Sequence, residues 1–250
     1  MSPLEISAMV FACVFGGALL GLWLGGILPP HHLNDETKSV VTLGVGLIGT
    51  MAALLLGLMV AAAQSSYGAR ASELTEMAAN TILLDRALAH YGPETAEIRL
   101  ALKAAVAHMI EQVWPRNGTQ AGNISGNVGS EAIFDRIQYL TPHTDAQRAI
   151  QSQAETMVIN LGQTRWLLFE QSGSSISIPF LVILVFWLSV IFLGFGLFAP
   201  RNATVVIALL VSAISVAGAI FLMLELDRPF SGLIQISSAP LSNALAVMGK

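Results

Sequence analysis

The stretch ATVVIALLVSAISVAGAIFLMLELDRPFSG, residues 203–232, joins a long apolar run to an abruptly charged end. Residues 203–224 carry no charged side chain. An α-helix needs about 20 apolar residues to cross the hydrocarbon core of a bilayer, and this run is long enough. The stretch therefore predicts a membrane-spanning helix that ends where Glu225, Asp227 and Arg228 begin.

The rest of the chain repeats this pattern. Its residues are 54% hydrophobic and only 11% charged, with a mean hydropathy of +0.67, whereas soluble domains are about 25% charged. Three further runs, at 6–28, 40–63 and 178–198, are long and apolar enough to span a membrane. We predict an all-α integral membrane protein with four transmembrane helices in two hairpins.

A polar block lies between the two hairpins. Apolar residues recur in it at spacings of three and four, which is typical of helices with one apolar face, and Gly92-Pro93 interrupts the first of these patterns. A Gly/Asn-rich segment at 116–129 predicts a polar loop. The predicted division is an N-terminal hairpin, a cytoplasmic helical region, a C-terminal hairpin and a cytoplasmic tail, at 1–66, 67–176, 177–226 and 227–250.

The distribution of Lys and Arg predicts the orientation. Arg70, Arg165 and Arg228 lie near span ends on the side that holds the polar block, whereas the opposite side has only Lys38 and Arg201. Because cytoplasmic loops carry an excess of Lys and Arg, both termini and the polar block are predicted to be cytoplasmic.

Small residues form one stripe of the first span, at Gly17, Gly21 and Gly25. Glycines four residues apart let two membrane helices approach closely. The stripe predicts helix packing, either within the chain or between subunits.

The second span has a bulky stripe formed by Leu47, Met51, Leu54 and Leu58, with Thr50 as the hydroxyl in its centre. Such a stripe faces lipid or the protein core. In a ring of subunits it would instead line a pore, where a hydrophobic constriction gates by dewetting.

Several function classes are excluded or disfavoured. The net charge of −4 and the lack of a basic cluster argue against nucleic-acid binding. The span interiors contain no ionisable Asp, Glu, Lys, Arg or His, which coupled transporters place at mid-membrane. His31 and His32 are adjacent and read as a solvated loop, since their spacing does not suit a metal site. We expect no catalytic residues, metal or cofactor, and so no enzyme.

The charged end of the fourth span admits two interpretations. Arg228 precedes Pro229, and because proline disfavours the α conformation in the preceding residue, the helix should end near Asp227. Carboxylates at Glu225 and Asp227 face the negative end of the helix dipole. They are either solvated at the membrane surface or docked onto arginines.

If they are docked, Arg70 and Arg165 are the best candidate partners, because arginine binds carboxylate through a forked pair of hydrogen bonds. Phe230 would then anchor the turn in an apolar pocket, and the chain would continue into an amphipathic tail. We refer to this arrangement as the C-terminal latch, formed by Glu225, Asp227, Arg228, Pro229 and Phe230.

Two motifs, LLDRALAHYGPE at 83–94 and LELDRPFSGLIQISSAPL at 224–241, resemble a bacterial bestrophin-like membrane protein family of unknown function. A distant resemblance to bestrophin anion channels implies a homo-oligomer, by analogy a pentamer, in the bacterial inner membrane. It implies that the second spans line a pore for anions such as chloride. Unlike the bestrophin constriction, the second span here lacks Phe, Tyr and Trp, and no calcium-binding acidic cluster is recognisable. The alternative is a non-conducting membrane scaffold or sensor whose cytoplasmic helices bind a partner protein.

Overall fold

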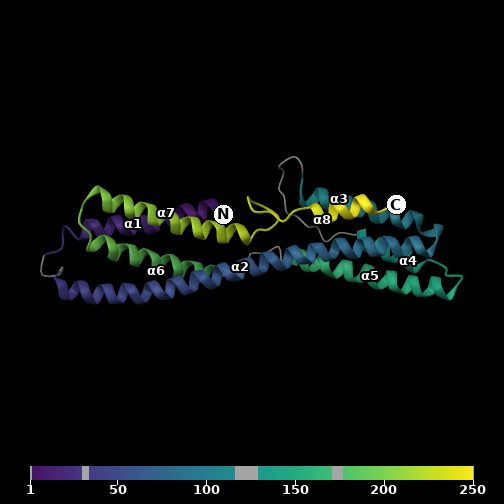
Figure 1. Cartoon of the computed structure of the whole chain (residues 1–250), viewed down its shortest axis with the longest axis horizontal. Helices are drawn as coiled ribbons and strands as arrows, with labels where there is room; N and C mark the ends of the chain where they lie inside the picture. The colour runs from purple at the N-terminus through teal and green to yellow at the C-terminus, as the bar shows by residue number, and fades with distance from the viewer. Residues whose placement is uncertain (1, 30–33, 116–128, 171–176, 250) are drawn as a thin grey trace. The chain divides into compact units, whose positions relative to one another are not determined.

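The computed structural model describes residues 2–29, 34–115, 129–170 and 177–249 (Figure 1). These residues form helices and contain no strand, which confirms the all-α prediction. The elements are α1 (Pro3–Leu24), α2 (Asp35–Tyr91), the 3-10 turn η2 (Pro93–Thr95), α3 (Ala96–Val113), α4 (Gly129–Gln138), α5 (Asp145–Glu170), α6 (Ile178–Leu197), α7 (Ala203–Leu226) and α8 (Ala239–Val247). Four of them, α1, α2, α6 and α7, are long and apolar enough to cross a membrane, as predicted.

Helix α2 is the longest element, with 57 residues, or roughly 86 Å at 1.5 Å per residue. No proline interrupts Asp35–Tyr91, so the spanning segment continues without a break into the polar block. Asp35 and Glu36 lie in the first turn, where negative charge is favoured by the helix dipole. The helix ends at Tyr91. The next residue, Gly92, has a φ of +142°, which suits glycine, and Pro93 begins the next turn.

The chain divides into two compact units. The membrane unit comprises Met1–Ser66 and Ser175–Asp227, and the polar unit comprises Tyr67–Ser174 and Arg228–Lys250. Within the membrane unit α1 packs against α6 and α7 (Figure 1). The packing partners of the first span therefore include both spans of the second predicted hairpin.

The polar unit is a bundle with two apolar clusters. One combines side chains of α2 and α3 with Leu168 and the tail residues Phe230, Ile236 and Leu241. The other combines α2, α3, α4 and α5, with Leu84 and Ile137 fully buried. Burial of a large apolar side chain from water stabilises a fold by about 1.5–3 kcal/mol, so these clusters account for the association of its helices.

Helix ends in the membrane unit follow local sequence signals. Ser2 and Glu5 form a reciprocal capping box at the start of α1, and the Asn202 side chain accepts a hydrogen bond from the Val205 N–H at the start of α7. Helix α7 ends at Leu226 with Asp227 as its C-cap, which confirms the end predicted from Arg228-Pro229.

Arg201 closes the C-terminal end of α1. Its guanidinium donates hydrogen bonds to the carbonyl oxygens of Leu22, at 2.9 and 3.1 Å, and Trp23, at 3.0 Å. The last carbonyl groups of a helix lack intrahelical donors, and a cation there complements the dipole. One of the two basic residues on the predicted outer side thus has a structural function.

Candidate functional site

The described residues of the membrane unit leave the bulky stripe of α2 uncovered. Leu47, Met51, Leu54 and Leu58 are 65%, 47%, 67% and 60% exposed, and Thr50 beside them is also exposed. We call these four apolar residues and Thr50 the α2 stripe. In the most apolar 18-residue stretch of α2 only 11% is buried, compared with 33% in the corresponding stretch of α6. The stripe therefore faces outward from this chain and is not part of its own core.

The spacing of the α2 stripe suits contact with another helix. Its four apolar residues follow one another at intervals of four, three and four, which is the heptad spacing of a helix–helix seam. Val40 and Leu43 extend the exposed surface toward the start of α2. The Thr50 hydroxyl donates to the Leu47 carbonyl at 2.7 Å, so its hydrogen is used within the helix.

The glycines of the first span lie against α6. A Cβ atom added at Gly17 would lie 2.8 Å from the Ser189 carbonyl oxygen. Cβ atoms at Gly21 and Gly25 would collide with the backbones of Leu193 and Leu197. Here the stripe of small residues serves packing within the chain. By contrast, the α2 glycines Gly46, Gly49 and Gly57 have open space beside them.

In the polar unit, Asp85 of α2 and Arg99 of α3 form a forked ion pair. Arg99 Nε lies 2.8 Å from Asp85 Oδ1, and Arg99 Nη2 lies 3.0 Å from Oδ2. The carboxylate is 2% exposed and the guanidinium 23%. Burial opposes ionisation of Asp85, but the hydrogen bonds from Arg99 and the Gly249 N–H, with the charges of Arg99 and Arg86, hold its pKa below the ordinary value.

This ion pair was not predicted from the sequence. A signal was present, because Asp85 falls seven residues after Ala78 and three before Leu88, on the apolar face of the helix. A carboxylate on a buried face requires a partner. Arg99, one turn into the next helix after the Gly92-Pro93 break, is that partner.

The C-terminal segment docks onto the polar unit at several points. Phe230 is 4% exposed and packs edge-to-face on Trp114, with ring centroids 5.9 Å apart. The Trp114 indole N–H donates to the Ile236 carbonyl at 2.9 Å. Further along, Lys103 Nζ donates to the Met248 carbonyl at 3.3 Å, and the Gly249 N–H donates to Asp85 at 3.3 Å. The tail is therefore an integral part of this bundle.

The latch residues are buried to different degrees. Glu225, Asp227 and Phe230 are buried, and so is Arg70, one of the two predicted partner arginines. Arg228 is exposed, and Pro229 accepts a hydrogen bond at its carbonyl from the Ile236 N–H at 2.8 Å. The pairing of these acids with Arg70 stays a prediction, and its test is given in the Discussion.

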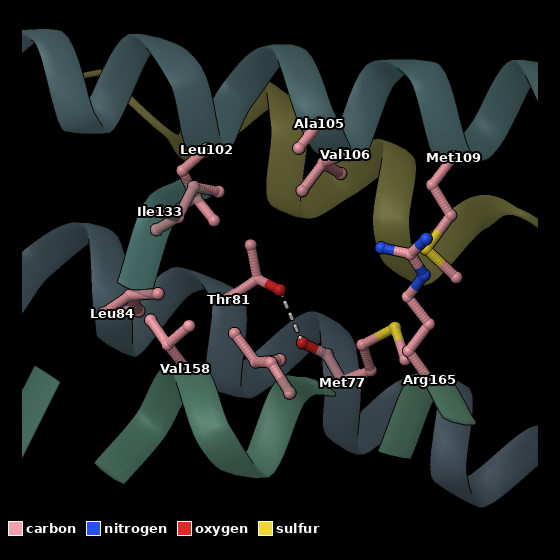
Figure 2. A pocket seen from close by; sticks show the side chains of 11 residues that line it. Met77, Thr81, Leu84, Leu102, Ala105, Val106, Met109, Ile133, Val158 and Arg165 are labelled. Atoms are coloured by element: carbon pink, nitrogen blue, oxygen red, sulfur yellow. Dashed lines mark hydrogen bonds between the residues drawn. The ribbon is translucent and has the colours of Figure 1, made fainter. Parts of the chain in front are cut away.

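Arg165, the second predicted partner, lines a cavity of about 80 Å³ inside the polar unit (Figure 2). We call this cavity the bundle pocket. Four helices, α2, α3, α4 and α5, contribute to its wall. The lining residues are Met77, Thr81, Leu84, Leu102, Ala105, Val106, Met109, Ile133, Val158, Leu161 and Arg165. Only Thr81 and Arg165 among them have polar side chains.

Two further predictions concerned the histidine pair His31 and His32 and a polar loop. His31 and His32 lie outside the described residues, as does the predicted polar loop at 116–129 except for Gly129, which begins α4. Within the ranges that the structure describes, no group of three or more His, Cys, Asp or Glu side chains is arranged to hold a metal ion.

The four apolar helices and the helical polar unit together define an all-α, multi-pass class of membrane protein. The family model of the bestrophin-like domain matches residues 12–241, and the chain belongs to that family. This match spans both motifs that carried the predicted resemblance and confirms it. No curated protein and no solved structure matches the chain.

Proposed function

We propose that this protein is an oligomeric, anion-conducting channel of the bacterial inner membrane, with no enzymatic activity and no cofactor. Its second spans would surround a central axis and form a hydrophobic constriction. The uncovered α2 stripe is the observation that carries the proposal. Membership of the bestrophin-like family adds support, because its distant resemblance to bestrophins implies an anion channel.

The chemistry of α2 fits a pore that opens by wetting. Residues 40–63 contain no charged side chain, so selectivity would not come from a ring of charges. Leu54 and Leu58 supply the apolar wall that excludes water when narrow. Gly46, Gly49 and Gly57, which have open space beside them, leave α2 thin on an adjacent face, and neighbouring copies could approach closely there.

The orientation proposed for the channel follows from the basic residues. The polar unit and both termini would be cytoplasmic, because most Lys and Arg residues near span ends are on their side. Arg201, on the other side, caps α1. An outside position for the polar unit would require its many arginines to be translocated.

A second candidate function is a non-conducting scaffold or sensor. The observation that favours it is the apolar surface of the polar unit. Several large side chains there are more than half exposed, which suits a protein partner. They are Leu83, Leu100, Tyr139, Trp166 and Leu167.

Reconstitution separates the two candidates. The purified protein is imaged for oligomeric symmetry and then placed in liposomes for measurement of chloride flux over a range of pH and calcium concentration. A closed ring that conducts chloride is expected. Well-folded oligomers that carry no flux under any condition would overturn the channel, and a non-conducting monomer or dimer that binds a partner protein would support the scaffold.

A further inference from the structure

A groove of about 390 Å³ runs between the start of α2 and the end of α6, within the membrane unit. The two helices lie side by side there (Figure 1). The wall includes Lys38, Thr42, Val45 and Gly49 of α2, and Phe195 and Phe198 near the end of α6. We call this cavity the α2–α6 groove.

Glycines determine where the two helices touch and where they leave space. A Cβ atom added at Gly194 would lie 2.8 Å from Val45 Cγ2, so α6 and α2 approach closely at that point. Beside Gly46 and Gly49, by contrast, an added Cβ atom would meet nothing within 4 Å. The helices are therefore in contact at Val45, and the α2–α6 groove lies open next to that contact.

The walls of the α2–α6 groove are apolar for most of its length. Phe195 is 52% exposed, and its ring lies against that of the buried Phe192, with centroids 6.1 Å apart. Ile191 and Gly194 also line the groove and are buried. Because these surfaces offer no donor or acceptor side chain, the part of a ligand that fits them is a hydrocarbon.

The polar side chains of the wall, Lys38 and Thr42, both come from the start of α2. The predicted span begins at Val40, so Lys38 lies at the level of the lipid headgroups, where long basic side chains near helix ends extend. Among the residues that the structure describes, neither side chain has a hydrogen-bond or ion-pair partner. Asp35 and Glu36 are exposed nearby but do not line the groove. A free cation therefore stands at the headgroup end of an apolar groove.

The length of the α2–α6 groove matches one leaflet of a bilayer. Lys38 and Gly49 are eleven residues apart, or about 16 Å along the axis of α2. The hydrocarbon core is about 30 Å thick, so one leaflet takes up about 15 Å of it. A helix of that length, about 10 Å across, would occupy more than about 1,200 Å³, roughly three times the volume of the groove. The groove thus suits a single hydrocarbon chain better than a helix of a second copy.

We propose that the α2–α6 groove binds one anionic phospholipid of the surrounding bilayer. The phosphate accepts hydrogen bonds from the Lys38 ammonium and the Thr42 hydroxyl, and one acyl chain lies along Gly46 and Gly49 beside Phe195. Basic pockets between membrane helices bind anionic headgroups in this manner. The two ends of the groove, one cationic and one apolar, are complementary to the two ends of this lipid.

This lipid site goes beyond the channel function and does not depend on conduction. In a ring of copies the acyl chain would cover the face of α2 at Gly46 and Gly49. Gly57, which also has open space beside it, does not line the groove and remains available to a neighbouring copy.

Native mass spectrometry of the full-length protein in detergent tests the proposal, because it counts bound lipids and chains together. The probes are phosphatidylglycerol and phosphatidylcholine with identical acyl chains. Saturable binding of one phosphatidylglycerol per chain is expected. Phosphatidylcholine should bind about fivefold more weakly, the ratio that corresponds to about 1 kcal/mol for one lysine beside an anionic headgroup. K38Q should abolish this preference, whereas K103Q, the same change in the polar unit, should retain it.

G49L tests the apolar part, because its side chain fills the groove and should lower the affinity for phosphatidylglycerol at least tenfold. The matched control is G218L, at an exposed glycine of α7 that also has open space beside it, and it should bind like the unsubstituted protein. The proposal is overturned if phosphatidylglycerol does not saturate at one per chain, or if K38Q and G49L bind it unchanged. An oligomer whose neighbouring copy fills the groove in place of lipid would overturn it too. Absence of chloride flux in the same preparation would count against the channel and leave the lipid site standing.

Discussion

The ion pair between Asp85 and Arg99 gives a quantitative prediction about the stability of the polar unit. Asp85→Asn keeps the shape of the side chain but replaces one acceptor oxygen with an amide. Hydrogen bonds that involve charged groups contribute about 1.5–3 kcal/mol each, and the asparagine retains one acceptor for Arg99. Because Arg99 is 23% exposed, water can hydrate it partly, so we expect a loss of about 2–3 kcal/mol.

Substitution of the other member of the pair, Arg99, should destabilise the polar unit more. Arg99→Gln leaves the Asp85 carboxylate, which is only 2% exposed, without its charged partner. Removal of one member of a buried ion pair costs about 3–5 kcal/mol. The double variant should destabilise less than the sum of the two, with a coupling energy of at least about 1 kcal/mol.

The pair also sets a pH dependence with a defined sign. The pKa of Asp85 is lower in the folded protein than its ordinary value of 3.8, so the unfolded chain takes up the proton first. The stabilisation is present above that ordinary value and is lost as the pH falls through the lower folded pKa. The difference in Tm between the unsubstituted protein and D85N should therefore shrink below about pH 4.

Thermal unfolding in detergent micelles, followed by circular dichroism, measures these effects. A loss of about 2–3 kcal/mol should lower Tm by roughly 10 °C for a unit of this size. Arg148→Gln is the control, because its ion pair with Asp145 is exposed, and it should leave Tm within about 1 °C. The reasoning would be refuted if the effects of D85N and R99Q were additive in the double variant. It would also be refuted if D85N had the same Tm as the unsubstituted protein at pH 7.

Three further predictions concern packing and the latch. Gly21→Val should reduce the yield of folded protein several-fold because the added side chain collides with the α6 backbone. Gly16→Val, beside open space, is its control, and equal yields would contradict the packing. Asp227→Asn and Arg70→Gln should couple by about 1 kcal/mol in a double-mutant cycle of thermal stability, and additivity would reject the latch. Phe230→Ala should cost about 3 kcal/mol and make the tail sensitive to limited proteolysis, whereas an equally resistant tail would show that Phe230 is not its anchor.

The helices of this protein could be predicted because their signals are local. The spans are long apolar runs, the lack of proline in 35–91 permits one continuous helix, and Gly92-Pro93 ends it. Likewise, Arg228-Pro229 determines the end of α7 through a steric effect on one neighbouring residue.

Partners across the fold were harder to predict. A stripe at Gly17, Gly21 and Gly25 indicates that some helix approaches closely, but any of the other spans satisfies that condition. The contact with α6 depends on the complementary Gly196, where a Cβ would collide with the Ala18 carbonyl. A periodic pattern in one helix contains no information about the small residue that faces it.

The bundle pocket had no sequence signal. Its lining residues, such as Leu84, Val106 and Val158, have the spacing of ordinary core positions, and a cavity arises only where four helices fail to fill the space between them. Arg165 lines this cavity. Its role as a latch partner, inferred from its place near a span end, stays a prediction.

The central claim is that the α2 stripe lines a water-filled path between copies of the chain. The single cysteine, Cys13, can be replaced by serine to give a background without thiols, into which Leu54→Cys or the control Leu222→Cys, at an exposed position of α7, is introduced. We predict that a water-soluble, charged thiol reagent changes the chloride current of the Leu54→Cys channel and leaves that of the Leu222→Cys channel unchanged. A conducting Leu54→Cys channel that does not react with the reagent would contradict the assignment of α2 as the pore helix.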